Sequence, residues 1–309
     1  MNPILVTGIN RSGTTWVGDT LARTPGVALI YEPFSPRHRH GIFRAPTPDW
    51  FTYVRADPYG RLAGDVRRML DFRYSYADEI RDLRSARDAG RMVRDAARFT
   101  RWRRAGSRPL IKDPIAVLAA PWLAREFDMQ VVVTIRHPAA YAASMLRLGW
   151  THDFSGFLAQ PGLVDDLVPD LVDDIAAMAR RPGDILDQAA LLWTVIHTVI
   201  AGYRRDHPNW VFVRHEDLSD APIAGFHDLA DRLGLELTAT VEAYVADMTR
   251  AGNPAEAPQG VIHELRRDSA ASARAWHTRL TPAEIARVRA ATEAVAPEFY
   301  GDDEWPAAD

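Results

Sequence analysis

The first sixteen residues contain a pattern that few folds can accommodate: a short apolar run breaks into a glycine-containing loop, and the loop opens a helix. The run begins at Ile4 and consists of β-forming residues, which is typical of a buried parallel strand. Gly8 and Gly13 let the backbone between them curl, so that its N–H groups converge with the positive end of the helix dipole. Ile4–Trp16 (ILVTGINRSGTTW) therefore predicts a phosphate-binding loop at the start of an α/β domain.

The side chains of this loop favour a strongly anionic ligand. Arg11 supplies a positive charge, and Ser12, Thr14 and Thr15 supply hydroxyl donors, which is more than an ordinary helix cap needs. The loop nearly matches the nucleotide-triphosphatase pattern G-x-x-x-x-G-K-[ST], but Thr14 stands where that pattern has lysine. Because the usual contact to the outer phosphates is then missing, a kinase or ATPase is the weaker alternative.

Length, charge and composition set the outer limits. A chain of 309 residues can form one large α/β domain, or one domain with a helical insertion. Its 37 basic and 41 acidic residues give a net charge of −4, which argues against nucleic acid as a partner. The lack of cysteine excludes disulfides and thiolate metal sites. No signal peptide precedes the first strand, and no apolar run approaches the roughly eighteen residues of a membrane span. We therefore expect a soluble, cytoplasmic protein.

A second strand brings a carboxylate to the same region. A helix is predicted over Thr14–Arg23, and a strand over Val27–Tyr31 ends in Glu32 and Pro33. Ligands of parallel α/β sheets bind at the carboxyl edge of the strands. Glu32 is therefore either a site residue on the edge that carries the Gly8 loop, or an ordinary surface glutamate.

Residues 35–106 lose strand character and are rich in arginine. Amphipathic stretches over 62–70 and 78–103, with a turn at 57–60, predict a helical insertion here. Its first part, Arg37-His38-Arg39-His40, could meet an acidic acceptor or could be a solvated charged loop. A metal site at the two histidines would need further ligands that the sequence does not identify.

The core pattern resumes with a strand over 109–111 and then Lys112-Asp113-Pro114, followed by a helix over 115–127. Lys112 is the only lysine among the 37 basic residues, which makes it conspicuous in an arginine-biased chain. A further strand, Gln130–Ile135, ends at Arg136, and Pro138 suits the first turn of a helix that runs to about residue 148. Ser144 lies about two turns into this helix, where its hydroxyl could reach an anion near Arg136.

The later segments carry less information. Residues 149–182 either border an acceptor pocket or form a solvated loop and helix. A buried helix is predicted over 185–205, a strand over 211–213, and a helix over 281–296 with a capping box that begins at Thr281. Arg266, Arg267 and Ser269 either fold over a nucleotide or form an exposed basic turn.

Four side chains thus follow four separate apolar runs: Arg11, Glu32, Lys112 and Arg136. In a parallel sheet these positions converge on one edge. A phosphate cradle, one carboxylate and three cations suit the transfer of a charged group from a nucleotide to a hydroxyl.

These motifs resemble those of the sulfotransferases that use 3′-phosphoadenosine 5′-phosphosulfate (PAPS), and bacterial members in particular. Arg11–Thr15 (RSGTT) is similar to the family's 5′-phosphosulfate loop, and 131–144 (VVVTIRHPAAYAAS) to its 3′-phosphate segment. Tyr31-Glu32-Pro33 resembles carbohydrate sulfotransferases, whereas Lys112-Asp113-Pro114 is also found in the tyrosylprotein branch. Residues 210–218 (WVFVRHEDL) look like a late strand of bacterial members, and 269–280 like their closing segment.

The resemblance implies an α/β, P-loop-like three-layer fold with a central parallel sheet. The whole chain, 1–309, would be one domain with a helical insertion at about 35–106 and a C-terminal closing segment at about 260–309. Histidine at 215, where tyrosine is common, and the weakly matching insertion depart from the family pattern. Both departures leave the acceptor open more than the donor.

The resemblance also implies roles for the site residues. Glu32 would be the general base, and Lys112 and Arg11 would stabilise the transferred sulfuryl group without a metal ion. His38, His152 and His215 are competing bases. Asp113 would hold the Lys112 loop by accepting backbone hydrogen bonds. The residues implied to hold PAPS are Arg11, Ser12, Gly13, Thr14, Thr15, Trp16, Arg136 and Ser144.

The acceptor is expected to be a hydroxyl on a carbohydrate or glycolipid, and an alcohol or phenol on a small metabolite or tyrosine fits the same site. Two alternatives to a sulfotransferase are a P-loop kinase of a small hydroxylated substrate and a non-catalytic nucleotide-binding protein. The missing loop lysine counts against the kinase. The presence of both Glu32 and Lys112 counts against the non-catalytic protein.

Overall fold

Five parallel strands form one sheet in the middle of the protein, in the order β2-β3-β1-β4-β5. The structure is a computed structural model, and it describes residues 1–45, 47, 49–57, 60–255 and 265–306. The centre of the turn expected at 57–60 and the first residues of the expected closing segment lie outside this described part. The strands are β1 (Ile4–Gly8), β2 (Val27–Tyr31), β3 (Arg108–Lys112), β4 (Gln130–Ile135) and β5 (Val211–Arg214).

The strand order places a crevice beside the phosphate loop. After β1 the chain crosses to β2 on one side of the sheet, whereas after β4 it continues to β5 on the other side. Loops that leave neighbouring strands in opposite directions open a crevice at their carboxyl ends, and ligands of α/β proteins bind there. Because β1 and β4 are hydrogen-bonded neighbours, this point lies between the loop after Gly8 and the residues after Ile135.

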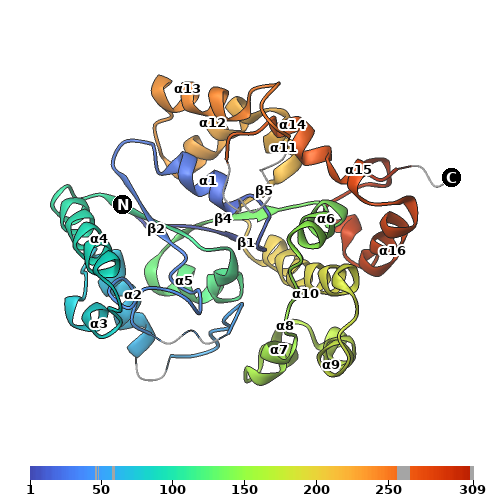
Figure 1. The fold of residues 1–309 in the computed structure, drawn as a ribbon, viewed down its shortest axis with the longest axis horizontal. Coiled ribbons are helices and arrows are strands. Elements are labelled where there is room, and N and C mark those ends of the chain that lie inside the picture. Colours follow the sequence, from blue (N-terminus) through green and yellow to red (C-terminus); the bar gives the residue numbers. More distant parts are fainter. Residues whose placement is uncertain (46, 48, 58–59, 256–264, 307–309) are drawn as a thin grey trace.

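Both faces of the sheet are covered, because successive strand residues point to opposite sides and both sides are apolar. Ile4 and Val6 belong to one hydrophobic cluster, whereas Leu5 belongs to the other. Figure 1 shows the resulting three layers, with helices above and below the sheet. The predicted three-layer α/β fold is thereby confirmed.

Helices lie on both sides of the sheet and at one end of it. Above the sheet in Figure 1 lie α1 (Thr14–Leu21), α11 (His215–Asp220), α12 (Pro222–Leu233), α13 (Ala239–Thr249) and α14 (Ser269–Arg274). Below it lie α5 (Ala120–Phe127), α7 (Ser155–Ala159), α8 (Leu163–Leu167), α9 (Val172–Arg180) and α10 (Ile185–Asp206), and α6 (Pro138–Leu148) is drawn to the right of β4. At the right are α15 (Trp276–Arg279) and α16 (Pro282–Thr292), the latter with the predicted capping box at Thr281.

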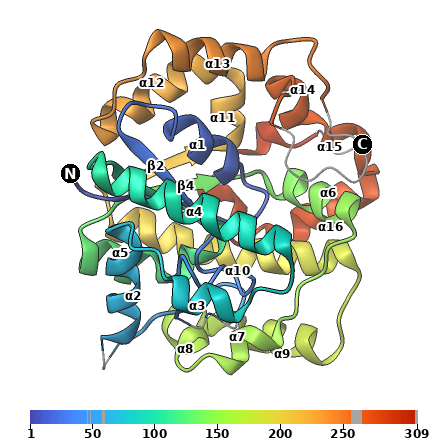
Figure 2. The same ribbon diagram turned by 60° about the vertical axis from the view of Figure 1, so that its left-hand side comes forward.

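Between β2 and β3 the chain forms α2 (Arg61–Leu70), α3 (Tyr76–Arg81) and α4 (Ala86–Arg104), and α4 crosses the front of the molecule in Figure 2. The sequence predicted one amphipathic stretch over 78–103, but the structure divides it in two. The reason is Ser85, whose side chain accepts a hydrogen bond from the backbone N–H of Asp88 and so starts a new helix.

The helix predicted over 115–127 is also divided. A 3₁₀ helix, Pro114–Ala119, precedes α5. Pro121 lies in the first turn of α5, and it has no N–H to continue a helical ladder from the residues before it. The strands over 27–31 and 130–135 agree with the prediction at both ends.

Within the described part of the chain, α10 is the only helix long and apolar enough to cross a membrane. Most of its apolar stretch, 72%, is buried inside the protein. Trp193 on this helix is fully buried, as the sequence predicted for a core helix.

Candidate active site

The loop between β1 and α1 needs glycine at two positions. Gly13 has a φ of 97°, and a Cβ atom there would lie 2.7 Å from Nδ1 of His215. A Cβ atom on Gly8 would lie 2.4 Å from the backbone oxygen of Thr134. The two glycines therefore let β1 approach β4 and let the ring of His215 approach the loop.

Two candidate site residues have a backbone conformation that non-glycine residues rarely adopt. Arg11 has a φ of 67° and Glu32 a φ of 43°, so both are in the left-handed region. Such a conformation costs on the order of 1–3 kcal/mol and persists where the surrounding structure enforces it. Glu32 directly follows β2 at the edge of the sheet, and Arg11 comes three residues after the end of β1.

Ser12 does not face the ligand side of the loop. Its hydroxyl donates to the backbone oxygen of Ile9 at 2.5 Å and lies 2.6 Å from Oγ1 of Thr134. Its backbone N–H also donates to Ile9. Ser12 therefore fixes the loop to the sheet, whereas its neighbours Arg11 and Gly13 line a pocket.

This pocket, which is called the donor pocket from here on, lies at the carboxyl edge of β1, β4 and β5. It encloses about 900 Å³ of empty space including its open mouth. No aspartate or glutamate is among its described lining residues. The lining consists of Arg11, Gly13, Thr14, Thr15, Trp16, Arg136, Ser144, Arg147, His215, Ser219, Met248, Thr249, Leu265, Arg267, Ser269, Ser272 and Arg279.

Hydrogen bonds join the predicted phosphate-binding residues of two loops. Arg136 Nη1 donates to the backbone oxygen of Arg11 at 2.6 Å, and Arg11 Nε donates to Ser144 Oγ at 3.2 Å. The indole N–H of Trp193 donates to the backbone oxygen of Arg136 at 2.8 Å. The structure thus brings Arg11, Arg136 and Ser144 together in one pocket.

The donor pocket concentrates positive charge. Burial, and then the nearby charges of Arg136, Arg147 and Arg267, together lower the pKa of Arg11 to about 10. Burial also lowers the pKa of Arg136 to about 10. Both guanidinium groups remain protonated at neutral pH, so the pocket is suited to a ligand with several negative charges.

Three buried donors in this pocket have no hydrogen-bond partner within the described residues. They are Trp16 Nε1, Arg136 Nε and Arg147 Nε. A buried donor without a partner is costly, and native proteins contain few of them.

Glu32 and Lys112 form a pair on the other side of β1. Lys112 Nζ donates to Glu32 Oε1 at 2.5 Å and lies 3.6 Å from the ring centre of Tyr31. Lys112 is fully buried, whereas 31% of the Glu32 side chain is exposed. Neither residue lines the donor pocket, and the loop after β1 lies between the pair and Arg136.

Gly18 of α1 leaves room for the stem of Lys112. A Cβ atom at Gly18 would lie 2.7 Å from Lys112 Cγ.

Replacing a glycine inside a helix by alanine usually stabilises the folded protein by about 0.5–1 kcal/mol. We expect Gly18→Ala instead to destabilise by about 1–3 kcal/mol in urea unfolding, because the new methyl group overpacks the site. Gly64→Ala on α2, where a Cβ atom meets nothing within 4 Å, is the control and should stabilise. A stabilised Gly18→Ala would contradict the contact.

Asp113 holds the chain after β3, as predicted. Its carboxylate accepts hydrogen bonds from the backbone N–H groups of Phe34 at 2.7 Å and Ile115 at 3.1 Å. Burial, followed by the nearby charge of Glu32, raises its pKa to about 7. Asp113 thus links the segment after Glu32 to the segment after Lys112.

The three competing bases have unfavourable surroundings. Burial, and then the nearby charges of Arg136 and Arg11, together lower the pKa of His215 to about 3. Burial lowers the pKa of His152, which packs against Phe154 and Phe157, to about 4. Burial also lowers the pKa of His38, and its Nδ1 lies 2.7 Å from the backbone oxygen of Ser35. His215 lines the donor pocket, whereas His38 and His152 do not.

Buried histidines also make stability depend on pH. Burial lowers the pKa of His137, His197 and His215 to about 3. The folded protein therefore binds fewer protons than the unfolded chain between about pH 3 and pH 6.5, so this stability is complete above that window and is lost as pH falls. We expect the free energy of unfolding in urea to fall from about pH 7 to about pH 5. His197→Phe, which keeps a ring against Trp193, should reduce the slope, and an unchanged slope would contradict this cause.

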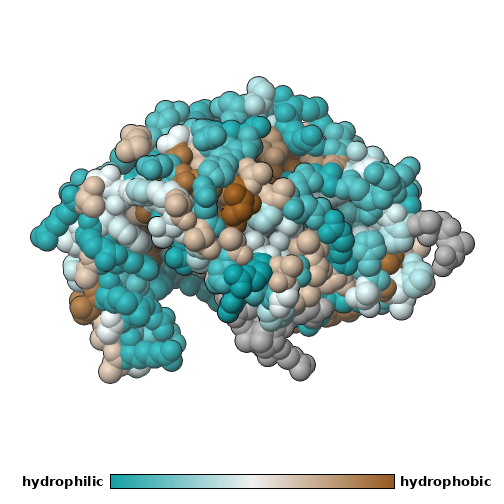
Figure 3. All heavy atoms as spheres, turned by 90° about the horizontal axis from the view of Figure 1, so that it is seen from above, coloured by the Kyte–Doolittle hydropathy of each residue, from teal (hydrophilic) through white to brown (hydrophobic). Residues whose placement is uncertain are grey.

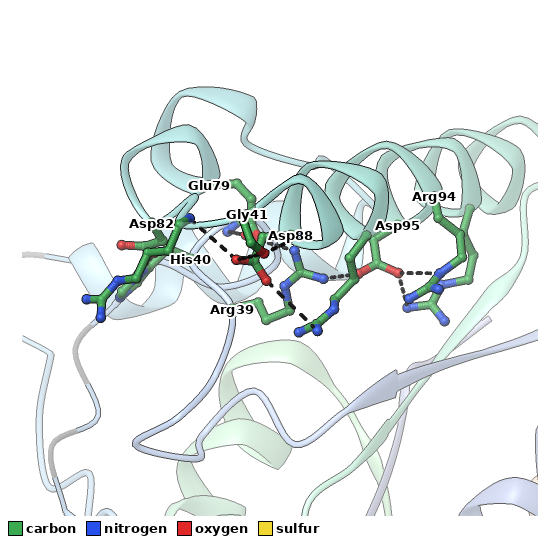
Figure 4. Close-up of polar contacts among 12 residues, drawn as sticks. Arg39, His40, Gly41, Glu79, Asp82, Asp88, Arg94 and Asp95 are labelled. Atoms are coloured by element: carbon green, nitrogen blue, oxygen red, sulfur yellow. Dashed lines mark hydrogen bonds and ion pairs between the residues drawn. The ribbon is translucent and has the colours of Figure 1, made fainter.

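A charged network anchors the segment after Glu32. Arg39 reaches between two helices and pairs with Glu79 of α3 and, at 2.5 Å, with Asp95 of α4 (Figure 4). Glu79 also accepts a hydrogen bond from the backbone N–H of Gly41, and both carboxylates are buried.

Viewed from above, a deep hollow separates the lobe over α3 and α4 from the body of the molecule, and its walls are mainly hydrophilic (Figure 3).

The segment at 149–182, expected either to border an acceptor pocket or to form a solvated loop and helix, is partly buried and partly exposed. Phe154 and Phe157 are buried in the core with Phe51, whereas the acidic residues of α9 are exposed. Gln160 accepts a hydrogen bond from the backbone N–H of Tyr53. This segment thus packs against the chain before α2.

The residue after Arg136 is held by the C-terminal part of the chain. The ring of His137 stacks on Trp276 at 4.7 Å and also contacts Tyr300 and Trp305. Its backbone N–H donates to Glu216 at 3.0 Å. Sequence reasoning missed this arrangement, because no motif connects His137 to aromatic residues more than a hundred positions away.

Of the three residues whose role was left open, two line the donor pocket. Arg267 donates its backbone N–H to Met248, and Ser269 Oγ donates to the backbone oxygen of Ser219 at 2.8 Å. Arg266 instead pairs with Asp247, and half of its side chain is exposed.

Several lining residues were not predicted: Arg147, Ser219, Met248, Thr249, Ser272 and Arg279. Arg147 could have been found, because it follows Ser144 by three residues on the same helix. Met248 and Thr249 carry no sequence signal of a ligand site. Among the described residues there is no group of three or more histidine, aspartate or glutamate side chains placed to hold a metal ion.

One family model matches the chain over most of its length. The family model described as "Sulfotransferase family" matches residues 3–239. The sulfotransferase domain from the curacin biosynthetic pathway is 13% identical, with 94% of this chain and 96% of that domain covered and a TM-score of 0.50. The domain from the olefin synthase of Synechococcus PCC 7002 is 16% identical, with 97% and 95% covered and a TM-score of 0.49. Mouse sulfotransferase SULT7A1, solved with PAP, is 13% identical, with 98% and 88% covered and a TM-score of 0.40. No curated protein matches the sequence.

Proposed function

Because the chain belongs to the sulfotransferase family, we propose that it transfers the sulfuryl group of PAPS to an acceptor hydroxyl. The observation that carries this proposal is the donor pocket at the crevice between β1 and β4, whose described lining includes five arginines and no aspartate or glutamate. PAPS bears negative charge at both ends, on its 5′-phosphosulfate and on its 3′-phosphate. A pocket with cations on two loops and no lining carboxylate matches that distribution.

The proposed binding mode follows the strand order. The loop N–H groups and the hydroxyls of Thr14 and Thr15 hold the 5′-phosphosulfate at the end of β1. Arg136 and Ser144, on the β4 side, hold the 3′-phosphate. The sulfuryl group then faces the β3 side, where Lys112 and Glu32 lie.

In the proposed reaction the acceptor oxygen attacks sulfur in line with the bond to the bridging oxygen. A new S–O bond forms, the S–O bond to the 5′-phosphate breaks, and Glu32 takes the hydroxyl proton. Lys112 and Arg11 stabilise the charge that grows on the sulfuryl group and the bridging oxygen. Fixed cations supply what a metal ion supplies in phosphoryl transfer.

For the acceptor we propose a hydroxyl on a carbohydrate or glycolipid. The motif Tyr31-Glu32-Pro33 and the hydrophilic hollow beside α3 and α4 favour a polar acceptor over an apolar one (Figure 3). We further propose that residues 1–309 act as one cytoplasmic bacterial domain, in which 35–106 is the insertion that frames the acceptor and 260–309 closes over the nucleotide.

The two rival functions make different binding predictions. A P-loop kinase of a small hydroxylated substrate requires ATP with magnesium. A non-catalytic protein would bind adenosine 3′,5′-bisphosphate without catalysing a reaction. Such a protein would have no use for the paired Glu32 and Lys112.

Two calorimetric titrations test which nucleotide is the donor. One uses adenosine 3′,5′-bisphosphate in EDTA, and the other, run in parallel, uses ATP plus magnesium. We expect the bisphosphate to bind without metal and more tightly than ATP. Binding of magnesium-ATP alone would contradict the sulfotransferase and favour a kinase. An acceptor screen with PAPS, starting from sugars and then phenols, would follow.

A further inference from the structure

Arg147 is a cation of the donor pocket that the motifs of the sequence do not include. It lies in the last turn of α6, three residues after Ser144, and residues three apart on a helix share a face. Both side chains line the donor pocket. Nε of Arg147 is buried and has no hydrogen-bond partner within the described residues.

The charge of Arg147 is not balanced by a nearby carboxylate. The described chain contains no aspartate or glutamate within ion-pair distance of it, whereas other arginines, such as Arg39 and Arg67, have such a partner. Arg147 lies close enough to Arg11 to lower the pKa of that guanidinium. Arg11 in turn bonds to Ser144, so these three side chains surround one end of the pocket.

We propose that Arg147 binds the phosphate on the ribose 3′ position of the donor and makes the pocket selective for nucleotides that carry it. This inference rests on the proposed function. Because the Arg147 side chain lines the donor pocket, its guanidinium group would donate charge-assisted hydrogen bonds to that phosphate. Arg147 is thus a specificity residue, next to Arg136 and Ser144, rather than a residue that acts on the reacting sulfur.

An arginine at this place could instead serve only the helix. Cations in the last turn of a helix stabilise it by about 0.3–1 kcal/mol through the helix dipole. That role would change the stability of the protein without changing which nucleotide it prefers. The ratio of two nucleotide affinities therefore separates the two roles.

The experiment compares adenosine 3′,5′-bisphosphate with adenosine 5′-monophosphate by calorimetry. For Arg147→Ala we expect the affinity for the bisphosphate to fall by about 10- to 100-fold, the range for one lost hydrogen bond to a charged group. The affinity for the monophosphate should stay within about twofold, because that ligand lacks the phosphate in question. Arg147→Lys keeps the charge and should recover part of the loss. Arg125→Ala, an exposed arginine on α5 outside the pocket, is the matched control and should change neither affinity.

Equal losses for both nucleotides, or no loss for either, would overturn the role of Arg147 while a bisphosphate preference of the wild-type protein still supported the proposed function. A wild-type protein that binds neither nucleotide would overturn the proposed function itself. Thermal unfolding of each variant checks that it is folded. Should Arg147→Ala not fold, Arg147→Gln, which keeps length and polarity, takes its place with the same expected ratio.

Discussion

Replacing Glu32 by glutamine is expected to lower the turnover number by about 10²- to 10⁴-fold, the usual contribution of a positioned general base. Glutamine has nearly the same shape and can still accept the hydrogen bond that Lys112 Nζ donates at 2.5 Å. What it loses is the ability to take the proton of the acceptor hydroxyl. The affinity for adenosine 3′,5′-bisphosphate should not change, because Glu32 does not line the donor pocket. Steady-state sulfation rates and calorimetry measure the two quantities separately.

The matched control for this variant is Glu126→Gln. Glu126 lies on α5 with 42% of its side chain exposed and pairs with Arg67 on the surface, so its loss should leave turnover and nucleotide affinity unchanged. Full activity of Glu32→Gln would show that another group is the base, even if the donor is PAPS. The histidines would then need renewed attention, although the lowered pKa of His152, about 4, makes it a weak proton acceptor.

Replacing Arg136 by alanine is expected to weaken binding of adenosine 3′,5′-bisphosphate by about 10²-fold or more. Two effects add. The variant loses a charge-assisted hydrogen bond to the nucleotide, worth about 1.5–3 kcal/mol. It also loses the 2.6 Å bond from Arg136 Nη1 to the backbone of Arg11, which holds the phosphate loop in its left-handed conformation. Calorimetry with the bisphosphate measures the loss directly.

Controls for Arg136 must separate binding from folding. Arg136 is buried and lies close to the charge of Glu216, so urea unfolding should accompany the titration. Arg136→Lys keeps the charge but not the fork of donors, and we expect it to bind with intermediate affinity. If Arg136→Ala were folded and bound the bisphosphate as tightly as the wild type, the assignment of the 3′-phosphate to the β4 side would be wrong.

The placement of the candidate site residues along one edge of the sheet could be predicted, because the carboxyl ends of parallel strands lie on the same edge. Four apolar runs of the right length are followed by Arg11, Glu32, Lys112 and Arg136, and in a parallel sheet their carboxyl ends share one edge. The helix after Pro138 was also predictable to the residue, since proline marks its start and Gly149 its end.

The wall of the donor pocket opposite the loop could not be predicted in the same way. It is formed by α11, α13 and α14, which approach the loop only through tertiary packing. The orientation of Ser12 is a second example. A hydroxyl in a phosphate loop is expected to face the ligand, but Thr134 on the neighbouring strand offers it a partner inside the sheet. Register between strands, rather than local sequence, decides such a contact.

The contacts of His137 with Tyr300 and Trp305 bear on the order in which the protein folds. All five strands of the sheet, the last of which ends at Arg214, precede these two aromatic residues in the chain. Because synthesis proceeds from the N-terminus, the sheet and the loop after β1 can form before either aromatic residue has left the ribosome. The residue after Arg136 is therefore enclosed later than the loop to which Arg136 is hydrogen-bonded.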